Sequence, residues 1–144
     1  MGLSGKRGQR GITLIELMVA LAIVSVLVAV AMPSYRAYVV RSRLPVALDA
    51  LTSYATRLEQ AYQDVGNYGV ANCVPAAVPT PDNFTVTCAV ANNGQGFTVT
   101  ATGSGIVSGY TYSIDNLGIR RTVSHPRGVP AANCWSLKGG SCDT

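Results

Sequence analysis

The 144-residue sequence has few of the residue types on which catalysis depends. Its single histidine, His125, stands in no recognisable motif with a serine or a cysteine, so we expect it to lie in a surface loop. The acidic residues after Glu16 are too scattered for a carboxylate pair or a calcium loop. Gly103-Ser104-Gly105 lacks the lysine of a phosphate-binding loop and is predicted to be a turn. These absences argue against an enzyme, and no cofactor is expected.

Cysteine is also scarce, and all four cysteines lie in the second half of the chain. None of them forms a Cys-x-x-Cys pair, which argues against a zinc site. An even number of cysteines in a small exported domain indicates disulfides and a periplasmic or extracellular location. Four cysteines allow three pairings. Short loops favour Cys73 with Cys88 and Cys134 with Cys142.

Charge is absent from most of one long apolar run, Ile12 to Met32. These 21 residues would form a helix of about 31 Å, the thickness of a bilayer hydrocarbon core. The run contains one acid, Glu16, and a charge at the centre of such a helix costs about 2.5–3.5 kcal/mol. Glu16 is either an acid tolerated near the membrane surface or a charge that acquires a partner.

A short basic leader with Lys6, Arg7 and Arg10 precedes this run. It is followed by Gly-Ile-Thr-Leu-Ile-Glu-Leu at residues 11–17. This order resembles the N-terminus of type IV pilin precursors. The resemblance implies that a prepilin peptidase cleaves the leader, residues 1–11, on the cytoplasmic side.

The resemblance also assigns roles to single residues. Gly11 would be the last residue of the leader, and Ile12 would become the N-methylated N-terminus, although many family members have phenylalanine there. Glu16 would meet the N-terminal amine of a neighbouring subunit, because a charge removed from water needs a partner. Pro33 corresponds to the proline that kinks the helix in this family.

An ordinary secretory signal is the competing interpretation of the N-terminus. Ala29-Val30-Ala31 would provide its small-residue cleavage site. Against this interpretation, the apolar run is longer than the usual 7–15 residues of a signal, and it contains Glu16. Basic residues flank the run on both sides, so the expected disulfides decide the orientation and place the leader in the cytoplasm.

Beyond the apolar run, a second helical pattern indicates that the helix continues. One face carries apolar residues at steps of three and four, namely Leu44, Leu48, Leu51, Ala55, Leu58 and Tyr62. Pro45 would add a kink or a short break. The whole helix, residues 12–62, would be about 75 Å long, whereas a domain made of the remaining residues has a radius of gyration of about 12 Å. Residues 12–32 must therefore project and be covered by lipid, and later by other copies of the chain.

The rest of the chain predicts a sheet and an irregular tail. Glycine and proline mark a connecting loop at 64–82. Alternating apolar residues then predict four strands, at 84–90, 97–102, 110–114 and 119–123. We expect an α+β fold with the domain boundaries of a long kinked helix (12–62), a loop and antiparallel sheet (63–124), and a disulfide-closed C-terminal segment (125–144). This is also the order of elements in type IV pilins.

Net charge argues only weakly for a nucleic-acid partner. The chain carries +4, but three of its eleven basic residues lie in the leader, which leaves eight basic against seven acidic residues. The C-terminal part nevertheless looks like the minor pilins of the PilE and ComP group, and ComP-type pilins are DNA-uptake receptors. The candidate DNA contacts are Arg120, Arg121, Arg127 and Lys138, with Trp135 against a base. Alternatively, Arg120 and Arg121 lie on opposite faces of a strand and Trp135 fills the core.

The predicted function is that of a type IV pilus subunit, a minor one, polymerised through its apolar helix. Its partners would be other pilin subunits, prepilin peptidase, the inner-membrane assembly machinery and, as an alternative, DNA. It would begin as an inner-membrane precursor and end in an extracellular pilus. A type II secretion pseudopilin is a further alternative.

Overall fold

A computed structural model describes residues 11–143 of the chain, so the leader residues Lys6, Arg7 and Arg10 lie outside it. The chain divides into two compact units, with the boundary between Ala37 and Tyr38. The first unit contains the N-terminal part of one helix, and the second contains the remainder of that helix with a sheet and two disulfides. Each unit is described separately.

Helix α1 extends from Leu14 to Val65. Thr13 caps its start, because its Oγ1 accepts a hydrogen bond from the backbone N–H of Glu16 at 3.3 Å. Gly66 ends it with a left-handed φ of +78° and donates its N–H to the carbonyl of Tyr62 at 2.7 Å. The helix thus begins two residues after the expected start and ends three residues after the expected end.

Both prolines of α1 lie inside the helix. The helix continues through Pro33 and Pro45, so of the two expectations at Pro45 the short break is excluded and the kink stays a prediction. A proline removes one hydrogen bond and strains the preceding turn, but the bonds on either side can hold the helix together. The kink at Pro33 stays a prediction.

The first unit has no internal core among its described residues. Every residue from 11 to 36 is exposed, and the apolar ones include Leu21, 62% exposed, and Leu27, 63% exposed. By length and composition, α1 is able to cross a membrane through this part. Such a surface requires lipid or protein around it.

The second unit is built on a four-stranded antiparallel sheet whose strand order is β1-β2-β3-β4. The strands are β1 (Phe84–Ala91), β2 (Gly96–Gly103), β3 (Thr111–Asp115) and β4 (Arg120–Ser124). Short 3-10 turns follow β1 and β2, at η1 (Asn92–Gly94) and η2 (Gly105–Val107). Each strand pairs with the next along the chain, as the alternating sequence pattern predicted.

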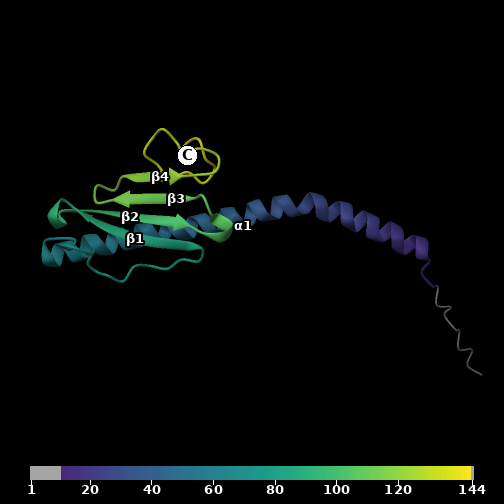
Figure 1. The fold of residues 1–144 in the computed structure, drawn as a ribbon, viewed down its shortest axis with the longest axis horizontal. Helices are drawn as coiled ribbons and strands as arrows, with labels where there is room; N and C mark the ends of the chain where they lie inside the picture. The colour runs from purple at the N-terminus through teal and green to yellow at the C-terminus, as the bar shows by residue number, and fades with distance from the viewer. Residues whose placement is uncertain (1–10, 144) are drawn as a thin grey trace, which may run out of the picture. The chain divides into compact units, whose positions relative to one another are not determined.

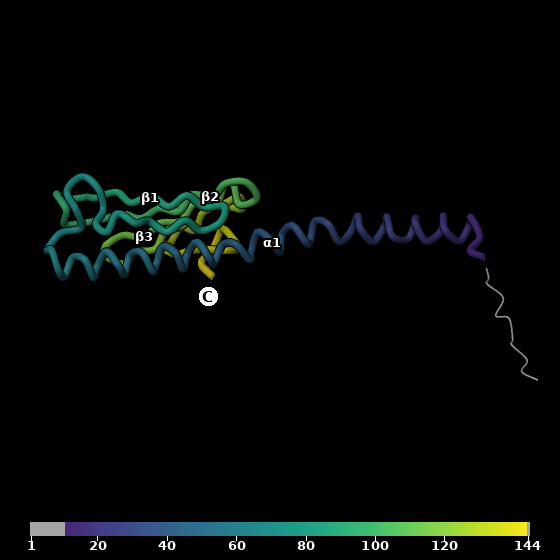
Figure 2. The backbone as a smooth tube through the Cα atoms, turned by 90° about the horizontal axis from the view of Figure 1, so that it is seen from below, coloured from purple at the N-terminus to yellow at the C-terminus, as the bar shows by residue number. Residues whose placement is uncertain are grey.

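One face of the sheet packs on the second part of α1 (Figures 1 and 2). The buried helix residues are Leu44, Ala47, Leu51, Tyr54, Ala55 and Leu58. The sheet contributes Phe97, Val99 and Tyr112, each 1% exposed or less. The helix stripe differs from the predicted one, because Ala47 and Tyr54 lie in the core whereas Leu48 and Tyr62 are only partly buried.

The connecting loop between α1 and β1 is fastened at several points. Cys73 forms a disulfide with Cys88 on β1. Tyr54 donates its hydroxyl to the carbonyl of Pro75 at 2.7 Å, and Arg43 forms a 3.0 Å ion pair with Asp82. The loop is therefore tied to both the helix and the sheet.

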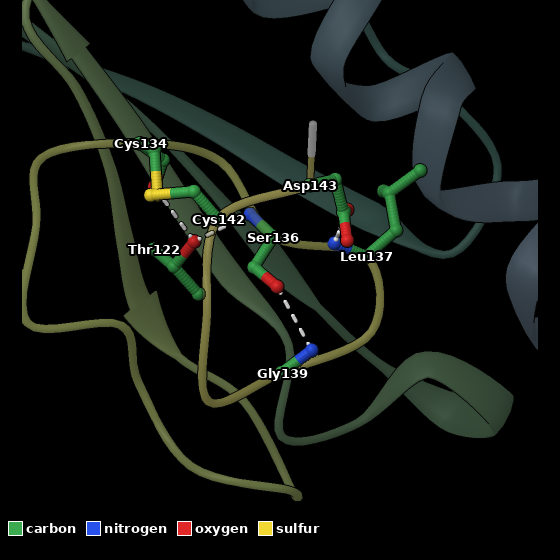
Figure 3. The surroundings of a disulfide bond; sticks show 7 residues. All are labelled: Thr122, Cys134, Ser136, Leu137, Gly139, Cys142 and Asp143. Atoms are coloured by element: carbon green, nitrogen blue, oxygen red, sulfur yellow. Dashed lines mark hydrogen bonds between the residues drawn. A yellow bond between two sulfur atoms is a disulfide. The ribbon is translucent and has the colours of Figure 1, made fainter.

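The C-terminal segment is held by a second disulfide, Cys134–Cys142, and by a hydrogen-bond network beneath it (Figure 3). Ser136 is fully buried; its N–H donates to Oγ1 of Thr122 at 2.8 Å, and its carbonyl accepts from the hydroxyl of Tyr112 at 2.9 Å. Its Oγ accepts from the N–H of Gly139 at 2.8 Å. Irregular backbone in a buried setting needs such partners, and this network provides them.

Candidate functional site: the N-terminal segment and the C-terminal basic residues

Gly11 and Ile12 lie just before the start of α1. Neither lies in the helix, and Ile12 is 74% exposed. The peptide bond between Gly11 and Ile12 is exposed and lies outside the helix. The sequence-predicted cleavage residues thus occupy an accessible position immediately before the helix.

Glu16 lies in the first turn of α1 and is exposed. A carboxylate there interacts favourably with the partial positive charge at the helix N-terminus. The next charged residue along the helix is Arg36, far outside the reach of an ion pair. A carboxylate that lipid or other helices cover either acquires a cationic partner or loses its charge by protonation.

The four basic residues singled out by sequence do not form one patch. Arg120 and Arg121 are adjacent on β4, opposite Ile114 and Ser113 of β3. Because successive residues of a strand alternate between faces, Arg120 shares the side of Ile114, which is the core side, and Arg121 lies on the other face. One flat surface cannot contact both guanidinium groups.

Arg120 stacks on Trp135, with its guanidinium carbon 4.8 Å from the ring centroid. The indole is fixed in turn, because its Nε1 donates to the carbonyl of Ser113 at 2.8 Å and the ring packs against the core. A shallow pocket of about 360 Å³ lies beside this pair and is also lined by Asn133 and Asp143. The sequence did not bring Asn133 to attention, because it becomes a neighbour of Arg120 only through the fold.

Arg127 and Lys138 are exposed and belong to adjoining loops. The N–H of Gly140 donates to the carbonyl of Gly128 at 2.9 Å, and a methyl group added to Gly139 would lie 2.7 Å from Cβ of Arg127, so the two loops are in contact. Within the basic set, these two residues therefore belong to loops that the fold brings together. The structure thus distributes the predicted contacts among the Arg127–Lys138 loops, the stacked Arg120 and the opposite face with Arg121.

His125 is buried, so the expectation of a surface-loop histidine was wrong. Its Nδ1 accepts the N–H of Arg127 at 3.0 Å, and the ring of Tyr110 packs edge-on at 4.8 Å between centroids. The close approach of Gly139 covers it from the other loop. The imidazole is a structural element of the C-terminal segment.

Basic residues are confined to two regions of the second unit. The sequence has no lysine or arginine from Leu58 to Ile119, although it has four acids there: Glu59, Asp64, Asp82 and Asp115. The described cations of this unit therefore lie on α1 before Leu58 and in the chain from Arg120 onward. Any polyanion must be contacted through one of these two regions.

Two family descriptions match consecutive parts of the chain. Residues 6–32 match the prokaryotic N-terminal methylation motif. Residues 33–111 match the type IV minor pilin ComP, DNA uptake sequence receptor. The second match ends before Arg120, so the basic C-terminal residues lie outside it.

Individual relatives agree with these matches. The chain is 32% identical over 108 residues to the fimbrial protein EcpC of Eikenella corrodens, which covers 72% of this chain and 70% of that protein. It is 30% identical over 89 residues to a fimbrial protein of Pseudomonas aeruginosa, covering 62% of this chain and 57% of that protein.

Two solved structures share the fold. A type IV pilin of Shewanella oneidensis matches with a TM-score of 0.51 and 25% identity, over 67% of this chain and 98% of that one. The non-core minor pilin PilV of Neisseria meningitidis matches with a TM-score of 0.53 and 16% identity, over 66% and 97%, and supports the fold alone. From the N-terminal motif, the helix with its four-stranded sheet and two disulfides, and these similarities, the chain belongs to the type IV pilin family, with a methylation motif followed by a ComP-like minor pilin domain.

Proposed function

We propose that this pilin is a minor subunit of a type IV pilus, assembled through the first part of α1. The observation that carries the proposal is an apolar helix, exposed at every residue from 14 to 36, that begins within an N-terminal methylation motif. Its surface is satisfied by lipid in the precursor and by other helices in a filament. The ComP-like domain favours a minor subunit. Pilins are structural proteins and not enzymes.

The proposal gives each N-terminal residue a role. Prepilin peptidase cleaves after Gly11, and Ile12 becomes the methylated N-terminus. Glu16 then pairs with the N-terminal amine of a neighbouring subunit, because both charges are desolvated in the filament. The inner-membrane assembly machinery extracts the processed subunit into a pilus on the cell surface.

Mass spectrometry of protein sheared from the cell surface tests this proposal. The expected product begins at Ile12, carries one methyl group on its N-terminal amine, and sediments with filaments. A matched strain without prepilin peptidase should retain the full precursor in the membrane. A secreted monomer that begins at Met32 would contradict the proposal, because it would have lost the assembling helix.

A DNA-binding receptor is a second candidate function, favoured by the match to the ComP family at residues 33–111. Within that match, no lysine or arginine follows Arg57. The sequence-predicted phosphate contacts lie in the C-terminal one of the two basic regions, where the loops that carry Arg127 and Lys138 adjoin. Arg120 already covers a face of Trp135, so a base would stack on the guanidinium rather than directly on that indole face.

Titration of the full chain in detergent with duplex DNA at several salt concentrations tests this candidate. Arg127→Ala with Lys138→Ala should weaken binding and lower the slope of log affinity against log salt by about 1 for each phosphate that the variant no longer neutralises. Arg57→Ala is the matched control, since it removes a cation from another region. No binding at low salt would exclude DNA as the ligand.

A further inference from the structure

The end of the second unit at which α1 enters it is built from several segments. The unit begins at Tyr38 of α1, and η2 and the end of β4 lie at this same end in both views (Figures 1 and 2). Arg43 of α1 pairs with Asp82 at 3.0 Å. The next residue, Asn83, accepts the N–H of Ser104, which precedes η2, at 2.8 Å. The start of the unit's helix and η2 are therefore linked across the sheet.

The loops of the C-terminal segment adjoin the same end. Ser124 donates its Oγ to the carbonyl of Gly109 at 2.8 Å, and a methyl group added to Gly109 would lie 3.4 Å from Pro126. Arg127 follows Pro126, and the loop with Lys138 contacts the loop with Arg127. We call this whole surface the entry end and define it as residues 38–43, 104–109, 125–128 and 137–140.

The entry end combines exposed cations with exposed apolar and aromatic side chains. Arg41, Arg127 and Lys138 are exposed on it, so it carries cations from both basic regions of the second unit. Tyr38 is 71% exposed, and Ile106 is 53% exposed on the η2 turn. A partner of this surface should therefore offer negative charge together with apolar contact.

The nearby acids do not cancel this positive charge. Asp82 pairs with Arg43, and the carboxylate of Asp143 accepts the N–H of Leu137. Asp49 is exposed, but it lies about 12 Å beyond Arg41 along α1. Arg120 and Arg121 on β4 add to the positive charge of the unit.

Helix α1 brings the entry end to a membrane surface. A helix crosses about 30 Å of hydrocarbon in about 20 residues, so a crossing that starts at Leu17, directly after Glu16, ends at Arg36. Tyr38 then lies about 3 Å and Arg41 about 7.5 Å beyond the hydrocarbon along the helix. The headgroup layer is about 5–8 Å thick on each side, and tyrosine is enriched at this level of a bilayer.

We propose that the entry end docks on the headgroups of anionic phospholipids at the membrane surface from which α1 emerges. Arg41, Arg127 and Lys138 contact the lipid phosphates, while Tyr38 and Ile106 lie between the headgroups. Because α1 holds the unit at the bilayer, the effective concentration is high and weak contacts are sufficient. A DNA backbone offers phosphates but no apolar layer for an aliphatic side chain such as Ile106. The inference rests on the proposed function, since it requires a precursor anchored in a membrane.

Site-specific cross-linking to lipid tests the contact. A photo-reactive phenylalanine derivative replaces Ile106 in the full chain, which is reconstituted into vesicles of phosphatidylglycerol mixed with phosphatidylcholine and irradiated. Mass spectrometry should detect lipid adducts at position 106. The same substitution at Leu117, 76% exposed in the β3–β4 turn at the other end of the sheet, is the matched control and should give few adducts (Figure 1). No adducts at position 106, or equal yields at both positions, would overturn the proposal.

Charge removal tests whether the contact is electrostatic. Arg41→Gln should lower the yield of adducts at position 106 about fivefold, the factor that corresponds to about 1 kcal/mol for a cation near an anionic membrane surface. Adding Arg127→Gln and Lys138→Gln should lower it further, as should vesicles of phosphatidylcholine alone. Arg57→Gln is the control, because it removes an exposed cation about 24 Å farther along α1. Unchanged yields in the Arg41 variant or in phosphatidylcholine would contradict docking on anionic headgroups.

Failure of this proposal is distinguishable from failure of the proposed function. Flotation of the unsubstituted chain with both kinds of vesicle shows that α1 is anchored in the bilayer, whatever the headgroup. If the chain does not float, the membrane-anchored precursor itself is wrong. If it floats and position 106 gives no lipid adducts, only the docking of the entry end is wrong.

Discussion

Helix α1 contains two apolar stretches that differ in what surrounds them. From Leu14 to Met32, apolar residues occupy all sides and every one is exposed within the chain. From Leu44 to Leu58, they form one stripe, which the sheet buries. An all-round apolar helix needs partners on every side, whereas a stripe is satisfied by a single sheet. The distribution of apolar residues around the helix therefore separates the part that folding buries from the part that the chain itself leaves uncovered.

Glu16 is the one charged residue of the first stretch, and its removal should have the largest effect on the behaviour of that stretch. Glu16→Ala leaves a desolvated N-terminal amine without its partner, and breaking a buried pair in this way costs about 3–5 kcal/mol. Incorporation into filaments should fall to background, while cleavage after Gly11 proceeds. Immunoblots of sheared filaments and membranes measure both. Normal incorporation would rule out the charge-pairing role of Glu16.

Truncating one leucine in each stretch should give opposite results for folding. Leu51 is fully buried, so Leu51→Ala should lower the free energy of unfolding of the second unit by about 2–5 kcal/mol. Leu21 is 62% exposed, so Leu21→Ala should change the same free energy of unfolding by less than about 0.5 kcal/mol. Denaturant unfolding of the full chain in detergent, followed by Trp135 fluorescence, compares the two. Equal decreases would show that the first stretch also contributes to the folded core.

Both disulfides belong to the second unit, so their removal should affect that unit and leave the first stretch of α1 unchanged. Removing either Cys73–Cys88 or Cys134–Cys142 should destabilise that unit by about 2–4 kcal/mol. Thermal unfolding with and without reductant measures the combined effect, and paired Cys→Ala variants separate the two bonds. The helical signal of the first stretch in detergent should stay unchanged. Equal melting temperatures in both conditions would count against a stabilising role.

The smallest expected effect concerns alkaline pH. Burial, together with the hydrogen bond to Glu59 and the charge of that carboxylate, raises the pKa of Tyr68 from 10.0 to about 12. Because the folded-state pKa is the higher one, this group's contribution is complete below pH 10 and is lost as the pH rises toward 12. Tyr68→Phe should flatten the fall in stability across that window, measured by denaturant unfolding. An unchanged pH profile would mean that Tyr68 does not titrate with folding.

Local patterns were sufficient to predict the elements of this fold. The spacing of Leu44, Leu51 and Leu58 predicted a helix face, and alternation predicted all four strands to within about two residues of their ends. Neighbours in a meander are neighbours in sequence, so the strand order also followed from the chain. At Pro45 the helix has no break, because a helix held on both sides can tolerate the loss of one hydrogen bond.

The candidate sites were only partly predictable. Gly11, Ile12 and Glu16 form a contiguous motif that requires no folding to be recognised. The arrangement of the basic residues could not be predicted without the fold, because residues that are neighbours in sequence do not share one surface. Arg120 stacks on Trp135, whereas Arg121 lies on the opposite face of the strand. The burial of His125 could not be predicted either, because Gly139, which packs against it, belongs to a loop that only the fold brings close.

The amino-acid sequence by itself determined the N-terminal processing motif, the all-round apolar helix and the succession of strands. These depend on composition and on the spacing of near neighbours. Tertiary structure alone decided which cations share a surface, and it brought the C-terminal end of α1 and the β1–β2 and β3–β4 turns to one end of the sheet. The physical reason is that surfaces are made by residues from distant segments, whose positions are fixed by packing and hydrogen bonds across the whole domain.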